Sequence, residues 1–145
     1  MSKDFKTITK VIELPHKYGA GKTYTVFFDG LRQGKLMGTK CPECGKVLVP
    51  GRSMCPECHV AIDKWVEVKQ KGTIVSWAKT DKDFYGKPYE GVYAVALIRL
   101  DGAGCDFLHL VGGNLKKLKS GAKVQAVWND EKKGHMLDIK YFELM

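Results

Sequence analysis

The sequence has no apolar run approaching the roughly 18 residues that a membrane-spanning helix requires, so no such helix is expected. Its first residues include no apolar stretch of the kind found in secretory signal peptides. These two absences make the cytoplasm the expected compartment. At 145 residues, the chain can hold one ordinary domain, or a small metal-binding module and one compact domain.

Acidic residues are under-represented: 24 Lys and Arg stand against 16 Asp and Glu, which gives a formal charge of +8. The excess is uneven, because residues 1–52 carry 10 basic and 4 acidic side chains, whereas residues 53–145 carry 14 and 12. This charge suggests an anionic partner such as a nucleic acid, a phosphorylated cofactor or an acidic protein surface. A solvated lysine-rich face explains it equally well.

Four of the five cysteines form two Cys-x-x-Cys pairs, Cys41 with Cys44 and Cys55 with Cys58. In each pair a proline follows the first cysteine, and a tight turn can aim both sulfurs at one point. Four thiolates complete a tetrahedral zinc shell and leave no open position for substrate, so this zinc is expected to be structural. Two disulfides, a redox pair and iron in the same shell remain alternatives.

The residues around the cysteines suggest a mainly β fold in three parts. Residues 1–37 are expected to form an N-terminal arm with an amphipathic helix over 24–36, on which Phe27, Phe28 and Leu31 share one face. This face could pack on the chain's own ribbon, or on another subunit or a ligand. Residues 38–63 are expected to form a rubredoxin-like zinc ribbon.

Residues 64–145 contain five apolar segments that are expected to be strands. The first covers residues 65–77, with Gly72 as the site of a bulge. A polar and aromatic loop over 80–91 follows, and then strands over 93–100, 105–111, 123–128 and 136–144. One helical turn capped by Asn114 separates the third and fourth strands. This order is typical of a five-stranded Greek-key barrel, the OB-fold.

The sequence shows little sign of self-contained catalysis. Covalent acyl transfer through a cysteine needs that nucleophile, a general base and donors for the oxyanion. Outside the two pairs there is one cysteine, Cys105, and the four histidines are scattered, with His109 inside an apolar strand. Because local spacing suggests no Cys–His pair, any such chemistry is expected to reside in a partner.

The chain resembles a family of small proteins that join a helical arm, a zinc ribbon and an OB-fold. Proteins of this family accompany thiolases and related acyl-CoA enzymes. The resemblance runs in order from about residue 24 to the C-terminus. The matching residues are Phe27, Phe28, Asp29, Gly30, Leu31, Gly34, Leu36, Cys41, Cys44, Gly45, Pro50, Arg52, Cys55, Pro56, Cys58, Trp65, Gly72, Val75, Ser76, Pro88, Tyr89, Gly121 and Val124.

This resemblance implies a non-catalytic subunit of a hetero-oligomeric thiolase complex, which assists coenzyme A or acyl-CoA binding and assembly. Within the family, the chain resembles the small subunits of benzoylsuccinyl-CoA thiolases of anaerobic toluene degradation. Their acyltransferase reaction cleaves benzoylsuccinyl-CoA with coenzyme A to benzoyl-CoA and succinyl-CoA.

The resemblance also implies an acyl-CoA passage between the arm and the barrel. Basic side chains there would hold the phosphates of coenzyme A by charge-assisted hydrogen bonds. The basic candidates are Arg32, Lys35, Arg52, Lys79, Lys82 and Lys87. Aromatic side chains could line the acyl or pantetheine path, and the candidates are Phe84, Tyr85 and Tyr89. These aromatic residues could equally serve only to pin the loop.

The alternative function is nucleic-acid binding, because zinc ribbons and OB-folds both occur in such proteins and the chain is basic. Trp77 and Tyr93 would then form a platform on which bases stack. The nearly neutral charge of residues 53–145 argues against this alternative, because a groove that binds nucleic acid should itself be basic.

Overall fold

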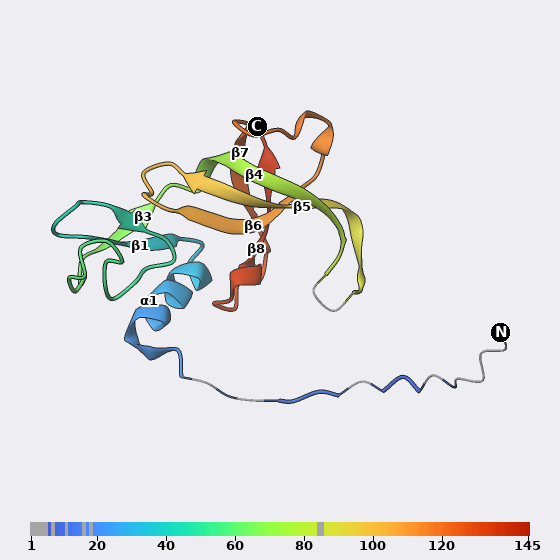
Figure 1. The fold of residues 1–145 in the computed structure, drawn as a ribbon, viewed down its shortest axis with the longest axis horizontal. Helices are drawn as coiled ribbons and strands as arrows, with labels where there is room; N and C mark the ends of the chain where they lie inside the picture. The colour runs from blue at the N-terminus through green and yellow to red at the C-terminus, as the bar shows by residue number, and fades with distance from the viewer. Residues whose placement is uncertain (1–5, 7, 11, 16, 18, 84–85) are drawn as a thin grey trace.

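The structure is a computed structural model that describes residues 6, 8–10, 12–15, 17, 19–83 and 86–145. One helix, a small ribbon sheet and a barrel follow one another along the chain (Figure 1). In order, the elements are α1 (Gly21–Arg32), β1 (Leu36–Lys40), β2 (Val47–Leu48), β3 (Trp65–Val68), β4 (Lys71–Lys82), β5 (Pro88–Leu100), β6 (Asp106–Gly112), η1 (Leu115–Lys117), β7 (Lys123–Trp128), η2 (Met136–Asp138) and β8 (Ile139–Leu144). Among the described residues, no helix has the length and apolar content to cross a membrane.

Helix α1 begins three residues earlier and ends four residues earlier than the expected span of 24–36. Gly34 causes the early end, since its φ of 72° lies in the left-handed region that glycine adopts without strain. The Gly34 N–H donates to the Leu31 carbonyl at 2.9 Å, and the Lys35 N–H donates to the Gly30 carbonyl at 2.8 Å. This pair of bonds is a Schellman motif, which closes the helix.

Strand β3 belongs to the ribbon, not to the barrel. It pairs with β1 in a three-stranded sheet of order β2-β1-β3, and the chain then leaves this sheet at Lys69 and Gln70. The expectation of one strand over 65–77 is therefore wrong. Gln70 ties the junction together, because its side chain donates to the Gly34 carbonyl at 2.6 Å and accepts from the Trp128 indole at 2.8 Å.

The remaining strands close into a barrel of order β4-β5-β6-β8-β7. Strands β6 and β8 run parallel, the other neighbours run antiparallel, and η1 lies between β6 and β7. Asn114 caps η1 by accepting from the Lys116 N–H at 3.1 Å. This topology is that of an OB-fold, which confirms the expected mainly β fold with a ribbon and a five-stranded barrel.

Two local expectations for the barrel are wrong. The segment expected to be a loop over 80–91 includes the ends of two long strands, because β4 runs to Lys82 and β5 begins at Pro88. The register of β4 against β5 shifts between Ile74 and Ser76 and between Thr80 and Lys82, not at Gly72. Gly72 is instead a point of close approach, since a Cβ there would lie 2.6 Å from the Arg99 carbonyl oxygen.

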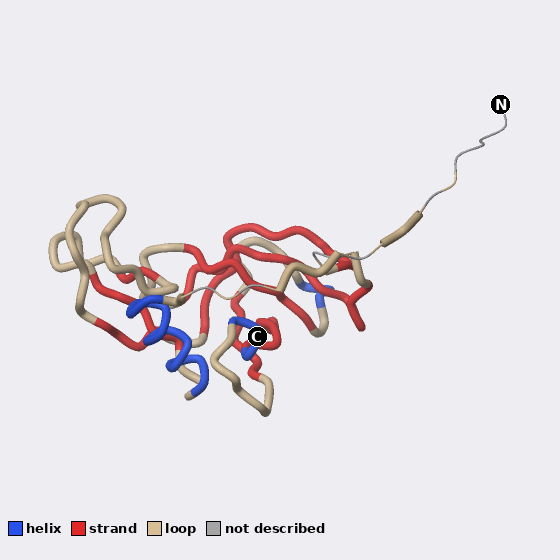
Figure 2. Tube along the Cα trace, turned by 90° about the horizontal axis from the view of Figure 1, so that it is seen from below, coloured by secondary structure: helices blue, strands red, loops and turns tan. Residues whose placement is uncertain are grey.

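One hydrophobic core joins the helix, the ribbon and the barrel. It contains Phe27 and Leu31 of α1, Val49 of the ribbon, and barrel residues such as Phe107 and Phe142. Figure 2 shows the helix and the ribbon together at one side of the barrel strands. Of the two possibilities that the sequence left open, packing on the chain itself is correct for Phe27 and Leu31, which are fully buried.

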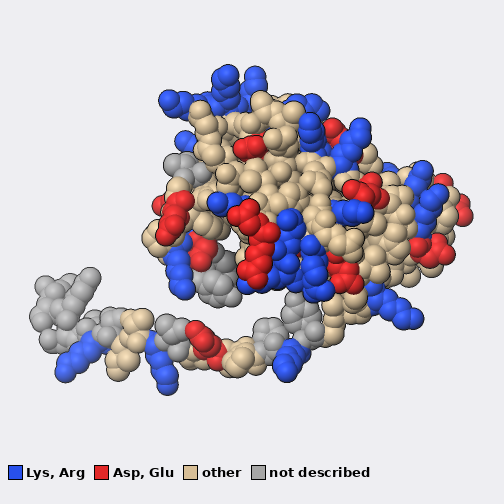
Figure 3. Space-filling view, turned by 180° about the vertical axis from the view of Figure 1, so that it is seen from behind, with Lys and Arg blue, Asp and Glu red and all other residues tan. Residues whose placement is uncertain are grey.

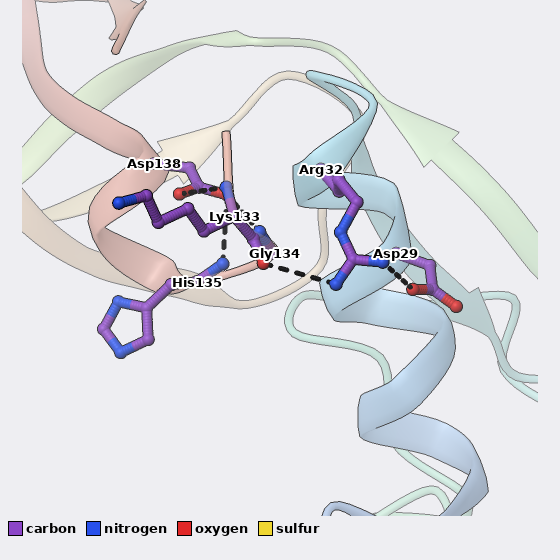
Figure 4. A network of polar contacts seen from close by, with 6 residues as sticks. All are labelled: Asp29, Arg32, Lys133, Gly134, His135 and Asp138. Carbon is purple, nitrogen blue, oxygen red and sulfur yellow. Dashed lines mark hydrogen bonds and ion pairs between the residues drawn. The ribbon is translucent and has the colours of Figure 1, made fainter. Parts of the chain in front are cut away.

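A polar network fixes the C-terminal half of α1 to the segment between β7 and β8 (Figure 4). The Asp138 carboxylate accepts from the backbone N–H groups of Lys133, Gly134 and His135 at 3.0, 2.7 and 3.0 Å. The Arg32 guanidinium donates to the Lys133 carbonyl at 3.3 Å. Burial alone would raise the pKa of Asp138, but these three donors outweigh it and lower that pKa.

His109 is enclosed inside the barrel. Its ring stacks on Phe107 with centroids 5.8 Å apart and meets the edge of Phe142 at 5.6 Å. Its Nε2 lies 3.3 Å from the Met136 carbonyl oxygen, and its Nδ1 is buried without a partner among the described residues. Burial lowers the pKa of this imidazole from its ordinary value of 6.5, so the folded protein favours the neutral ring.

This histidine should make the protein acid-sensitive. Below pH 6.5 the unfolded chain binds a proton at His109 that the folded chain resists, so the free energy of unfolding should fall as the pH decreases below 6.5. The variant His109→Phe should show a smaller decrease between pH 7.5 and pH 5.5. Urea unfolding at both pH values measures the difference, and equal decreases in the two proteins would contradict it.

Candidate metal centre

The four paired cysteines converge on one point of the ribbon. The Sγ atoms of Cys41, Cys44, Cys55 and Cys58 all lie within 4.8 Å of one another. The sulfurs of Cys44 and Cys55 are 3.8 Å apart. A tetrahedral zinc ion with zinc–sulfur bonds of about 2.3 Å places its sulfurs about 3.8 Å apart. The residues present therefore fit a zinc ion with four sulfur ligands.

The two knuckles share one backbone geometry. The Gly45 N–H donates to the Cys41 carbonyl at 3.1 Å, and the His59 N–H donates to the Cys55 carbonyl at 3.0 Å. Gly45 and His59 both have positive φ, 71° and 56°. Glycine adopts this conformation without strain, whereas a residue with a Cβ such as histidine pays about 1–2 kcal/mol. His59 therefore contributes to the second knuckle through the conformation of its backbone. Its exposed ring is not among the gathered ligands.

The charges of the site call for a cation. Backbone N–H groups of Cys58 and Glu57 lower the pKa of Cys55 to about 7, so its thiolate forms readily. Hydrogen bonding from the neighbouring Cys44, together with burial, raises the pKa of Cys58 to about 12. To hold all four sulfurs as thiolates the site needs a cation, because adjacent thiolates repel one another and a divalent ion offsets that repulsion. Lys46 and Glu57 form an ion pair that links the two knuckles.

Cys105 connects the barrel to the ribbon. Its sulfur lies 3.2 Å from the Val49 amide nitrogen, which donates to it, and 3.4 Å from the Val49 carbonyl oxygen. His109 lies four residues further along, which is about 13 Å in an extended strand. The structure therefore does not bring Cys105 and His109 together as a nucleophile and its base.

The expected coenzyme A residues near α1 are engaged within the chain. Arg32 lies 3.6 Å from the Asp29 carboxylate and also contacts the Lys133 carbonyl. Lys35 lies 3.6 Å from the Glu67 carboxylate. Basic and acidic side chains alternate over much of the face in Figure 3. Both side chains remain largely exposed, so Arg32 and Lys35 stay predictions as phosphate contacts.

The other expected residues lie in two further places. Arg52 lines a cavity of about 310 Å³ beside the start of α1, and its backbone N–H and C=O both bond the Thr39 hydroxyl. Lys79, Lys82, Lys87 and Tyr89 lie on the β4–β5 hairpin, which extends from the barrel away from the ribbon (Figure 1). Phe84 and Tyr85 lie outside the described residues. The described candidates thus fall into three groups: one near the end of α1, one at Arg52 in the ribbon, and one on the β4–β5 hairpin.

Trp77 and Tyr93 do not form a joint platform. Trp77 pairs with Ala96, whose side chain faces the core, and Tyr93 pairs with Thr80. Thr80 lies three positions after Trp77, and successive side chains of a strand alternate between its faces. The two aromatic rings therefore point to opposite faces of the hairpin.

The sequence did not reveal the positioning roles of Gln70, Cys105 and Asp138, although Cys105 was considered as a possible nucleophile. Asp138 carried a usable signal, because His135 and Asp138 have the spacing of a capping box, which the structure contains. Gln70 and Cys105 carried none, since their partners lie 36 and 56 residues away.

Comparison with known proteins agrees with this architecture. A family model described as the ChsH2 rubredoxin-like zinc ribbon domain matches residues 28–63, and one described as the ChsH2 C-terminal OB-fold domain matches residues 65–129. A DUF35 domain-containing scaffold protein of Pyrococcus furiosus is 28% identical over 93 residues, which are 64% of this chain and 68% of that protein.

Two solved structures are similar along most of the chain. A DUF35-family protein of unknown function from Sulfolobus solfataricus has a TM-score of 0.63 and 28% identity, covering 86% of this chain and 82% of that one. An Ltp2-ChsH2(DUF35) aldolase has a TM-score of 0.63 over 88% of this chain and 98% of that one, and its 21% identity shows the fold alone. With adjoining matches from residue 28 to residue 129, the chain belongs to the family that joins a ChsH2-type zinc ribbon to a ChsH2-type C-terminal OB-fold domain.

Proposed function

We propose that this chain is a non-catalytic subunit of a thiolase-type acyl-CoA complex, in which it supports assembly and coenzyme A binding. The proposal depends on one observation: in the ribbon and the barrel, the cysteine thiols and His109 make structural contacts and form no catalytic group. The four thiols face one another, Cys105 bonds the Val49 backbone, and His109 is enclosed in the barrel. The scaffold name of the Pyrococcus relative and the paired name of the aldolase support a partner-bound role.

The metal in this proposal is a structural zinc ion bound by the four cysteines. Its sulfur shell is full, so the ion holds the two knuckles together and offers no position to substrate. The thiolates also favour a reducing compartment, which supports the cytoplasm as the location.

Coenzyme A is proposed to contact the β4–β5 hairpin, whereas Arg52 lies apart from it in the ribbon. No ion pair within the described part of the chain involves Lys79, Lys82 or Lys87, in contrast to Arg32 and Lys35. Three exposed ammonium groups on one hairpin suit the phosphates of coenzyme A. The sequence resemblance supports benzoylsuccinyl-CoA, from anaerobic toluene degradation, as the acyl-CoA.

The test is co-purification from the native host followed by kinetics. A thiolase-type chain identified by its sequence should accompany the tagged protein, and the complex should thiolyse benzoylsuccinyl-CoA whereas the purified chain alone should not. Lys82→Glu should raise the KM for coenzyme A by about tenfold, as the loss of one charge-assisted hydrogen bond predicts. The control Lys64→Glu changes an exposed lysine next to the ribbon strand β3 and should leave that KM unchanged.

Two results would contradict the proposal. Thiolysis by the pure chain that Cys105→Ala abolishes would make the chain itself the enzyme. Tight binding of a single-stranded oligonucleotide by the chain, lost in Trp77→Ala and unaffected by coenzyme A, would favour the nucleic-acid alternative.

A further inference from the structure

The outer face of strands β5 and β6 carries aliphatic side chains, although a sheet face open to water normally carries polar ones. Leu97 pairs with Leu108, and Val95 pairs with Leu110, so the four side chains form a block of two by two. Their strand neighbours Ala94, Ala96, His109 and Val111 are buried and face the core. Leu108 is 60% exposed and Leu97 is 36% exposed. We call Val95, Leu97, Leu108 and Leu110 the aliphatic block.

The block has clear boundaries. At one end, Arg99 and Asp106 form an ion pair at 2.5 Å across the same two strands. At the other end, the rings of Tyr93 and Tyr141 close over Gly112, where a Cβ would lie 2.8 Å from each ring. On the β4 side, Ser76 pairs with Leu97 and Ala78 pairs with Val95, so small side chains keep that flank low.

The outer face of β7 and β8 has a different composition, with Val127 opposite Tyr141 and one polar pair beside them. On β7 and β8 the outward pair Gln125 and Glu143 is joined by a hydrogen bond of 2.9 Å, as expected of a solvated sheet face. The aliphatic block breaks that rule over two adjacent strands. Because the barrel core is already closed beneath it, the block is not needed to fold the barrel.

The size of the block indicates what covers it. With strands about 4.8 Å apart and a rise of about 3.3 Å per residue, the block and its β4 flank span roughly 200 Å². Three strands spaced about 4.8 Å apart are wide enough for one helix, which is about 10 Å across with its side chains. A stable interface buries about 800 Å² on each partner, so two copies of this chain joined only through the block would fall far short.

The partner must therefore also contact other parts of the chain. The N-terminal segment provides apolar side chains that the chain itself leaves uncovered, since Ile8 is 90% exposed and Ile12 is 74% exposed. The described residues of this segment lie away from the helix, the ribbon and the barrel (Figure 1). A subunit that contacts both the segment and the block can bury the area that the block alone lacks.

We propose that the aliphatic block is a docking surface for one apolar helix of the catalytic subunit. This inference rests on the proposed function, and it identifies the surface of the barrel that the partner covers. The chemistry suits a protein helix, because the block offers neither a cation for phosphate nor an aromatic face for a base. The helix would lie along β5 and β6, with the Arg99–Asp106 pair at one rim.

The experiment compares two leucines of similar exposure, 60% for Leu108 and 63% for Leu137. Leu108→Lys places a charge in the block, and Leu137→Lys places the same charge on η2, where the leucine is 63% exposed. The probe is the thiolase-type subunit recovered with the wild-type chain, purified and titrated against each variant. Leu108→Lys should raise the Kd by about 10- to 100-fold, as expected for loss of one buried leucine, and Leu137→Lys should leave it within about twofold.

The outcomes separate the docking surface from the proposed function. If the wild type binds and both variants bind equally well, the docking surface is wrong and the proposed function stands. If the wild type binds no thiolase-type subunit, the proposed function fails and this inference fails with it. If the wild type is a dimer that only Leu108→Lys makes monomeric, the block is an interface between copies of this chain. Zinc content and the thermal unfolding midpoint of each variant establish that the folds are equal.

Discussion

Replacing Cys44 with serine is expected to release the metal and leave the protein largely insoluble. Serine stays protonated at neutral pH and cannot replace a thiolate ligand of zinc. Beneath the knuckles the ribbon buries only Cys41, Leu48, Cys55 and Ile62 as its own cluster. Structural zinc contributes about 10–16 kcal/mol of apparent binding free energy to small ribbons, far more than such a cluster supplies.

Metal analysis and the soluble fraction after expression measure this result. The wild type should hold one equivalent of zinc, and Cys44→Ser should hold almost none. Cys105→Ser is the matched control, because it changes a cysteine that contacts the ribbon without being among the gathered sulfurs. A Cys44→Ser protein that keeps a full equivalent would rule out the four-sulfur site, and iron in the wild type would change the metal but not the ligands.

The second large effect should come from Phe27→Ala. This ring is fully buried in the core that α1 shares with the ribbon and the barrel. Truncating a buried phenylalanine typically destabilises a protein by about 3–5 kcal/mol, which is a large part of the stability of a domain of this size. The barrel should lose the same stability as the helix, because both pack on the same residue.

Urea unfolding followed by tryptophan fluorescence and by circular dichroism tests this expectation. The two signals should change together and at a lower urea concentration than in the wild type. Tyr24→Ala is the control, since Tyr24 lies on the same helix and is 51% exposed. An unchanged barrel transition in Phe27→Ala would show that the helix is an independent arm.

The spacing of nearby residues was sufficient to predict the metal site and the outline of the barrel. A Cys-x-x-Cys pair needs only one turn to aim its sulfurs, and the structure closes each turn with a bond between residues four apart, such as Gly45 to Cys41. Asn114 caps η1 from two residues away. Short apolar segments likewise marked β6 and β7, although the sequence did not show which side chains of β6 face the core.

Contacts between distant residues decided the rest. Residues 65–77 have one continuous strand pattern, yet β3 pairs with β1 and β4 pairs with β5 and β7, since strand pairing depends on edges formed elsewhere in the chain. The aliphatic block likewise became visible only when the register joined Leu97 to Leu108. The candidate cations appeared alike in the sequence, but the fold brought Glu67 to Lys35 and left Lys82 on an extended hairpin.

The sequence by itself determined which four cysteines could share one metal ion and the presence of a small β-barrel, because both depend on spacing within a few residues. Only the tertiary structure decided which faces meet the core and which remain open to a partner. The bulge between Ile74 and Ser76 illustrates the physical reason. One extra residue in a strand reverses the face of every side chain that follows, so the direction of Trp77 depends on how β4 pairs with β5 and not on its neighbours in sequence.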